Sequence, residues 1–223
     1  MKAIVLFVLA VIPTIAFCQT NTLDKKAKKL WVTAKFYPSL TRDVNGSSSH
    51  EVNFDHDHRL AFSGGVELTK ELVPNKWSIT TGILIHDFGY KEKAWSDFIP
   101  NYETRYSTRK IRYLTLPFSA QFHLKNFYFG LGVNLSHLIN TTTVVNMIPN
   151  YTPTASSDVH SWLIGVHGKT GYKHELSDHF SLNFELYAIV TEALMGSFPA
   201  LIWENSNTGY YSFGAGLGLD YKF

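Results

Sequence analysis

The sequence has little of what several common kinds of protein chemistry require. It contains one cysteine among 223 residues, Cys18, so neither a disulfide framework nor a thiol site is expected. Its formal net charge is only +2, which gives no electrostatic reason to expect nucleic-acid binding. The only long apolar run, Ala3 to Phe17, lies near the start, and nothing later has the ~20 apolar residues of a transmembrane helix. These absences leave a protein without thiol chemistry, nucleic-acid partners or a mature helical membrane span.

The first residues have the pattern of a bacterial signal peptide. Lys2 is followed by the apolar run and by small residues at Ala16 and Cys18. We expect cleavage after Cys18, which makes residues 1–18 the signal peptide and 19–29 a lysine-containing periplasmic lead-in. An uncleaved anchor and a lipidated Cys18 are the alternatives. Phe17 departs from the small residue that lipidation requires before the cysteine.

Period-two alternation of apolar and small or polar residues recurs through the rest of the chain, and it is typical of β-strands. Aromatic residues, which favour strands and membrane interfaces, make up 15% of the sequence. The alternating segments cover residues 30–38, 60–70, 77–86, 114–124, 127–136, 161–173, 180–188 and 210–223. In the last segment one face is wholly apolar or aromatic, namely Tyr211, Phe213, Ala215, Leu217, Leu219, Tyr221 and Phe223. The pattern predicts about eight strands.

The connections between these segments alternate in length. Short turns are predicted at 73–76, 125–126 and 177–179, and long loops at 40–57, 87–108, 139–160 and 192–209. Outer-membrane barrels have this asymmetry, with short periplasmic turns and long extracellular loops. The sequence therefore predicts an all-β fold: an antiparallel up-and-down transmembrane β-barrel of about eight strands over residues 30–223. Both termini are expected in the periplasm of a bacterium, and outer-membrane lipid is the expected surrounding.

Three segments resemble a known family. They are Tyr113-Leu114-Thr115-Leu116-Pro117-Phe118, Phe129-Gly130-Leu131-Gly132-Val133, and the closing Gly214-Ala215-Gly216-Leu217-Gly218-Leu219-Asp220-Tyr221-Lys222-Phe223. Together they resemble the PorT-like outer-membrane β-barrel family of Bacteroidota. The closing segment is also similar to the signal that the outer-membrane assembly machinery reads. The resemblance implies a fold and a location, and it carries no catalytic residues.

One cluster has the residue types of a metal site. Asp55, His56, Asp57 and His58 are consecutive, and alternate residues of an extended segment share a face. His56 with His58, or Asp55 with Asp57, could therefore bind a divalent cation. The alternative is a polar extracellular loop, and the spacing matches no established zinc motif.

A second set of charges is predicted to face inward: Lys35, Glu67, Lys169, Lys173, Glu185 and Asp220. An eight-stranded barrel is just wide enough for its own side chains, so such charges must be paired. A salt-bridged plug is therefore expected, and a narrow polar pathway is the alternative.

The leading functional hypothesis is a non-enzymatic outer-membrane barrel without catalytic residues or cofactors. Its loops would bind an extracellular or envelope partner of unknown identity, or its body would support the envelope. A membrane-embedded lipid-modifying enzyme is one alternative, suggested by Ser136 beside His137 and by His160 beside Ser161. A soluble lipocalin-like ligand carrier is the other.

Overall fold

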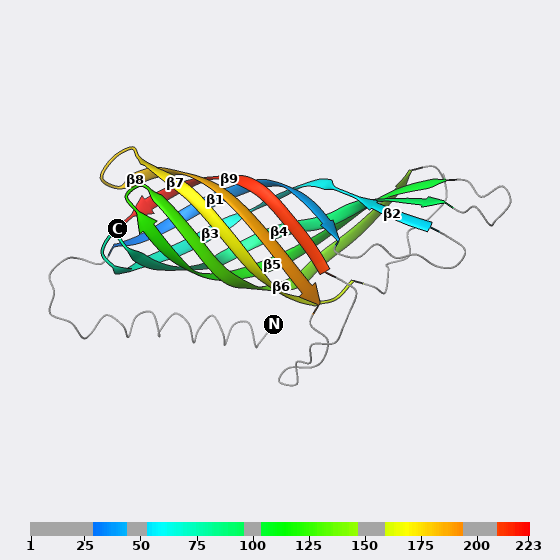
Figure 1. Cartoon of the computed structure of the whole chain (residues 1–223), viewed down its shortest axis with the longest axis horizontal. Helices are drawn as coiled ribbons and strands as arrows, with labels where there is room; N and C mark the ends of the chain where they lie inside the picture. Colours follow the sequence, from blue (N-terminus) through cyan, green and yellow to red (C-terminus); the bar gives the residue numbers. More distant parts are fainter. Residues whose placement is uncertain (1–28, 44–52, 96–103, 147–158, 194–208) are drawn as a thin grey trace, which may run out of the picture.

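The computed structural model describes residues 29–43, 53–95, 104–146, 159–193 and 209–223, and its regular elements there are β-strands (Figure 1). They are β1 (Leu30–Asp43), β2 (Asn53–Asp57), β3 (Arg59–Val73), β4 (Trp77–Trp95), β5 (Arg105–Leu124), β6 (Phe127–Asn146), β7 (Trp162–Glu175), β8 (Phe180–Ala193) and β9 (Gly209–Lys222). No helix in the described ranges is long and apolar enough to span a membrane. The predicted signal peptide and almost all of the predicted lead-in, residues 1–28, lie outside these ranges.

Eight strands close into a barrel in which neighbours are antiparallel (Figure 1). Their order is β1, β3, β4, β5, β6, β7, β8 and β9, and β9 pairs again with β1. The closing ladder starts with Trp31 opposite Lys222 and ends with Asp43 opposite Tyr210. Closure leaves no unpaired backbone edge in hydrocarbon, as a bilayer requires. The predicted antiparallel up-and-down barrel of eight strands is confirmed, and β2 is a short additional strand beside β4.

The three short turns lie at one end of the barrel, the end that also holds the C-terminus (Figure 1). They comprise residues 74–76, 125–126 and 176–179, which confirms the predicted turns to within one residue. Asn75 and Lys125 adopt left-handed backbone conformations, with φ of 56° and 57°. Such conformations are typical of tight hairpin turns.

The predicted strand ends at the opposite end of the barrel were wrong. Residues 87–108 and 139–160 were expected to be loops, but β4 continues to Trp95, β5 begins at Arg105 and β6 continues to Asn146. Part of the predicted 40–57 loop is also strand, because β2 begins at Asn53. The prediction ended each strand where its outward apolar residues stop. Backbone pairing continues beyond that level, where polar outward residues are allowed.

The outward face of the barrel is apolar. Large hydrophobic side chains point away from the interior and are about half exposed or more, among them Phe36, Leu60, Ile83, Phe118, Leu131, Val166, Phe184 and Leu217. Near the short-turn end, aromatic side chains pair across strands, as Trp77 does with Phe122 and Phe180 with Tyr221. A contiguous apolar surface of this extent, with interfacial aromatics, is the surface that a membrane barrel presents to lipid.

The inward face carries polar side chains, tyrosines and glycines. A Cβ added at Gly171 would lie 2.5 Å from the Tyr128 hydroxyl, and one added at Gly216 would overlap the Tyr37 ring. These two glycines therefore leave room for tyrosines to lie flat across neighbouring strands. The interior is filled by side chains, as expected for eight strands.

Candidate functional site

The middle of the barrel contains a buried network of ion pairs. Lys35 Nζ lies 2.7 Å from Glu67 Oε2 and 2.8 Å from Glu185 Oε2, and Lys169 Nζ lies 3.0 Å from Glu67 Oε2. The Tyr37 hydroxyl donates to Glu185 Oε1 at 2.8 Å. All of these residues are less than 9% exposed. The network links β1, β3, β7 and β8 across the lumen, and it confirms four of the six predicted inward charges and their pairing.

The remaining two predicted inward charges form a second pair near the short-turn end. Lys173 Nζ lies 2.9 Å from Asp220 Oδ2 and 4.2 Å from the centre of the Trp31 ring. The cation therefore has both a carboxylate and an aromatic partner. Sequence reasoning found these charges from their alternation. The same alternation puts Tyr128, Tyr187 and Tyr210 on the inward face, but it does not predict the aromatic cluster, because ring packing depends on which strands meet across the lumen.

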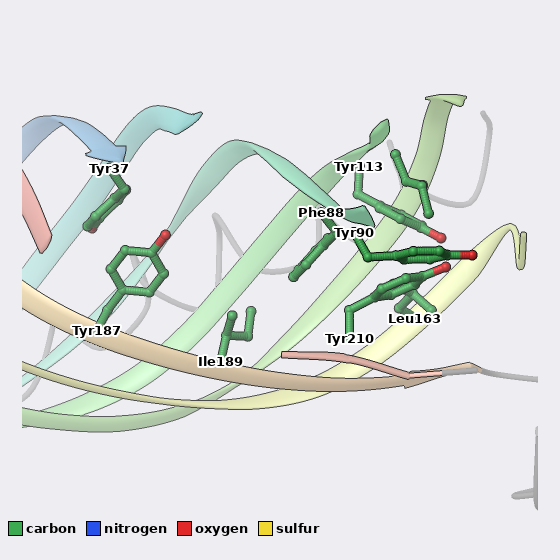
Figure 2. Close-up of a cluster of buried hydrophobic side chains, with 9 residues drawn as sticks. Tyr37, Phe88, Tyr90, Tyr113, Leu163, Tyr187, Ile189 and Tyr210 are labelled. Atoms are coloured by element: carbon green, nitrogen blue, oxygen red, sulfur yellow. The ribbon is translucent and has the colours of Figure 1, made fainter. Parts of the chain in front are cut away.

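Aromatic side chains fill the other end of the lumen (Figure 2). The rings of Tyr37 and Tyr187 meet edge to face at 4.6 Å, while Tyr90, Tyr113 and Tyr210 gather nearer the mouth. The buried cluster comprises Tyr37, Phe88, Tyr90, Ile111, Tyr113, Leu163, Tyr187, Ile189 and Tyr210. The lumen is thus closed by aromatic packing on one side of the ion-pair network.

A small cavity of about 30 Å³ lies between these layers, lined in part by His86, His167 and Asn134. The ring nitrogens of both histidines have no hydrogen-bond partner among the described residues. Pockets for small molecules typically measure about 300–1,000 Å³. This cavity is therefore far too small to hold a substrate of that kind.

The serine–histidine neighbours suggested by the sequence do not meet as dyads. Ser136 Oγ is buried and lies 2.9 Å from Thr115 Oγ1, whereas the next residue, His137, packs against Trp162 at 4.4 Å between ring centres. Adjacent residues of a strand point to opposite faces. In the second pair, His160 and Ser161, the backbone oxygen of His160 accepts a hydrogen bond from the Tyr113 hydroxyl.

The predicted metal residues lie along β2, opposite a segment of β4 with complementary charge. Asp55, His56 and Asp57 lie directly opposite Lys93, Glu92 and Lys91, respectively. Opposite charges across an antiparallel pair stabilise its register. The order Asp-His-Asp on one strand against Lys-Glu-Lys on the other therefore holds β2 against β4.

The four residues do not converge on one point. His56 is buried, whereas Asp55, Asp57 and His58 are exposed, and the His58 Nε2 lies 3.0 Å from the Tyr211 hydroxyl. Within the described residues, no group of three or more histidine, cysteine or carboxylate side chains is arranged to hold a metal ion.

His56 is instead the centre of a polar contact between three strands. Its Nδ1 lies 2.5 Å from Asp43 Oδ2, its Nε2 lies 3.4 Å from Glu92 Oε2, and its ring stacks on Tyr90 at 4.3 Å. Burial by itself would lower the pKa of His56, but the two carboxylates outweigh it and raise that pKa from 6.5 to about 9. His56 is therefore charged at neutral pH.

The position of β2 is expected to depend on pH. Because the pKa of His56 is raised in the folded state, its contribution is fully present below pH 6.5 and is lost as the pH rises through about 9. Titration of isotope-labelled His56 by NMR should show a midpoint near pH 9, and Asp43→Asn should lower it. A wild-type midpoint near 6.5 would contradict the three-strand contact.

Beyond the barrel mouth, β2, β4, β5 and β6 continue as a protruding sheet (Figure 1). β7 pairs with β6 only as far as Trp162 opposite His137, followed by one bond from Leu138 N to Ser161 O. From Asn140 to Asn146, β6 pairs with β5 on one side, Ile139 is an extra residue at a bulge, and no strand of the described residues pairs with the other side of 139–146. We call residues 139–146 the β6 edge. At about 3.4 Å per residue it is roughly 25 Å long.

The chain matches known barrel structures, but with low sequence identity and low TM-scores. Neisserial surface protein A is 14% identical, with a TM-score of 0.41 over 85% of this chain and 95% of that one. Ail, the attachment invasion locus protein of Yersinia pestis, is 8% identical, with a TM-score of 0.42 over 88% and 99%. The outer membrane protease OmpT of Escherichia coli is 11% identical, with a TM-score of 0.38 over 92% and 100%. Curated protein sequences give no match.

The comparison with protein families gives a match over most of the sequence. The outer membrane protein beta-barrel domain family matches residues 38–198, from within β1 to just beyond β8. The match agrees with the closed antiparallel wall and with its apolar outward face. The chain therefore belongs to the outer membrane protein beta-barrel domain family, whose members are barrels of the bacterial outer membrane.

Proposed function

We propose that this protein is a non-enzymatic surface receptor that binds an extended segment of a partner protein along the β6 edge. The observation that carries the proposal is the side of β6 from Ile139 to Asn146, outside the barrel wall, with which no strand in the described part of the chain pairs. Alternate N–H and C=O groups of such a strand point away from its one neighbour. They offer hydrogen bonds to any extended chain that lies alongside, which is binding by strand addition.

The composition of the β6 edge supports a binding role. Proteins usually protect exposed edges with charged residues, proline or very short strands. The edge Ile-Asn-Thr-Thr-Thr-Val-Val-Asn has no charge and no proline, and its threonines and valines favour β-structure. At the other side of the protruding sheet, β2 is only five residues long and carries Asp55 and Asp57. Among the strands that the structure describes, one edge of the protruding sheet is thus protected and the other has no pairing partner.

The filled interior supports a role without catalysis. The lumen is occupied by the ion-pair network and the aromatic cluster, and the small cavity between them cannot accept a lipid or peptide. This favours partner binding over the alternative of a lipid-modifying enzyme. The soluble-carrier alternative is wrong, because the chain belongs to an outer-membrane family.

We also propose how the protein is placed in the cell envelope. The short turns and both chain ends would be periplasmic, the protruding sheet would be extracellular, and residues 1–18 would be a cleaved signal peptide. Membership of the PorT-like branch stays part of the proposal, supported by the strand motif that begins at Tyr113. The last strand would be the segment read by the assembly machinery.

Peptide selection tests the proposed function. Extended peptides displayed on phage and selected on the protein in lipid nanodiscs should bind wild type and lose at least tenfold in affinity with Thr143→Pro. A proline in the edge removes a backbone donor and disturbs strand pairing. The matched variant Thr143→Val keeps the strand and should bind normally. Equal binding to the proline variant, or the absence of any selected peptide, would contradict the proposal.

A further inference from the structure

The strand behind the β6 edge is strongly cationic. The sequence Arg-Tyr-Ser-Thr-Arg-Lys-Ile-Arg, residues 105–112 of β5, has four basic residues and no acidic one. The β6 edge in front of it is uncharged. A strand added to β6 would therefore meet neutral side chains first and positive side chains one strand further in.

Two of these cations lie directly behind threonines of the edge, one on each face of the sheet. Lys110 is opposite Thr142 and Arg109 is opposite Thr143. Lys110 points outward and is exposed, and no carboxylate within the described residues forms an ion pair with it. Arg109 is on the inward face, where it donates to the Tyr90 hydroxyl at 2.9 Å. The remaining guanidinium donors of Arg109 are not used by that bond.

These two side chains are long enough to reach an added strand. Neighbouring strands lie about 4.8 Å apart, so a strand added to β6 would be about 10 Å from β5. Threonine is short, and a lysine or arginine can lie over it toward the next strand while keeping its charged group in water. A glutamate on the added strand would cover the remaining distance.

Of the other two basic residues of this segment, Arg105 lies beyond the pair of Tyr106 and Asn146 at which the β5–β6 ladder ends, and Arg112 is already neutralised. Arg112 is opposite Asn140, but its Nε and one terminal nitrogen donate to Asp87 on the far side, at 2.7 and 3.0 Å. Lys110 and Arg109 therefore provide the charge available to a ligand at the β6 edge.

The opposite edge of the protruding sheet has the reverse character. On β2, Asp55 and Asp57 are exposed, and these carboxylates would lie closer to an added acidic strand than the β4 lysines that they face. Charge thus directs an acidic segment toward β6 and away from β2.

We infer that the partner segment bound at the β6 edge is acidic, with aspartate or glutamate at alternate positions. This inference rests on the proposed function, because it names the kind of strand that the edge accepts. Lys110 and Arg109 would make the edge prefer an acidic segment over a neutral one. The backbone hydrogen bonds would contribute the same affinity for either segment.

The test uses short synthetic peptides and the full-length protein in nanodiscs. One peptide alternates glutamate with threonine or valine, and a second replaces every glutamate with glutamine. The acidic peptide should bind about tenfold more tightly at low salt, since each exposed ion pair contributes about threefold. The preference should shrink as salt is raised. Lys110→Gln should remove about threefold of it, whereas Lys76→Gln, an equal charge change in a turn at the other end of the barrel, should leave it unchanged.

The outcomes separate the two claims. Equal affinity for the acidic and the glutamine peptide would overturn the acidic preference and leave strand addition standing. An acidic preference that Lys110→Gln and Lys76→Gln reduce alike would also overturn it. Two further peptides test strand addition itself. Each carries backbone N-methyl groups on alternate residues, so that the N–H groups along one of its two edges are blocked, and the two peptides differ in which edge that is. One of these two should fail to bind, and full binding of both would overturn the proposed function together with the inference.

Discussion

Replacement of Glu67 by alanine is expected to lower the free energy of unfolding of the barrel by about 3–5 kcal/mol. Glu67 is 3% exposed and accepts from both Lys35 and Lys169. Without it, Lys35 keeps Glu185, but Lys169 loses the carboxylate that neutralises it. A buried charge without a partner costs far more than the pair contributes, because desolvation is no longer offset.

Denaturant unfolding in detergent or liposomes measures this effect. The double variant Glu67→Ala with Lys169→Met should recover much of the loss, since it removes the unpaired charge together with its partner. Glu192→Ala, which removes an exposed glutamate of β8, should change stability by less than about 0.5 kcal/mol. A Glu67→Ala barrel as stable as wild type would show that the network does not hold the lumen closed.

A second large effect is expected at the C-terminus. Changing Tyr221 and Phe223 together to aspartate should abolish accumulation in the outer membrane. Both aromatic side chains are on the outward face, where Tyr221 also packs against Phe180, and the backbone of Phe223 bonds to Leu30 to close the barrel. Two carboxylates there would weaken the closing strand and remove the aromatic residues that we propose the assembly machinery reads. An open edge in hydrocarbon is not tolerated, so partial assembly is not expected.

Cell fractionation and immunoblotting measure the outcome. The variant should cross the inner membrane and then be degraded or aggregate in the periplasm. Lys222→Gln lies on the same strand but on the other face, and it should assemble normally. Wild-type levels of the aspartate variant at the cell surface would contradict the role of the last strand.

Much of the barrel could be predicted, because strand residues face lipid and lumen in turn and the sequence therefore alternates with a period of two. Lipid outside and a filled lumen inside force apolar and polar residues to alternate, as in Phe213 to Phe223, and outer-membrane barrels regularly have short turns at one end. The inward charges, such as Lys35 and Glu185, followed from the same alternation. Their partners did not, since pairing depends on which strands meet across the lumen.

The candidate site was harder to predict because it lies beyond the apolar band of the barrel wall. There, the lipid no longer imposes alternation, so β4, β5 and β6 were ended too early in the prediction. The Asp55–Asp57 segment has the residue types of a metal site, and its relation to Lys91, Glu92 and Lys93 becomes visible only with the β2–β4 register. The uncharged, β-favouring run from Ile139 to Asn146 was the one sequence signal that could have indicated the edge.

The central claim, that the β6 edge is open at the cell surface, is tested most directly by single-cysteine labelling. Cys18 is the only native cysteine and lies in the predicted signal peptide, so a mature protein would have no background. Val144→Cys, on the exposed side of β6, should react with a membrane-impermeant maleimide on intact cells. Lys76→Cys, in a short turn, should react only after the outer membrane is permeabilised. Labelling of position 76 but not 144 on intact cells would contradict the account.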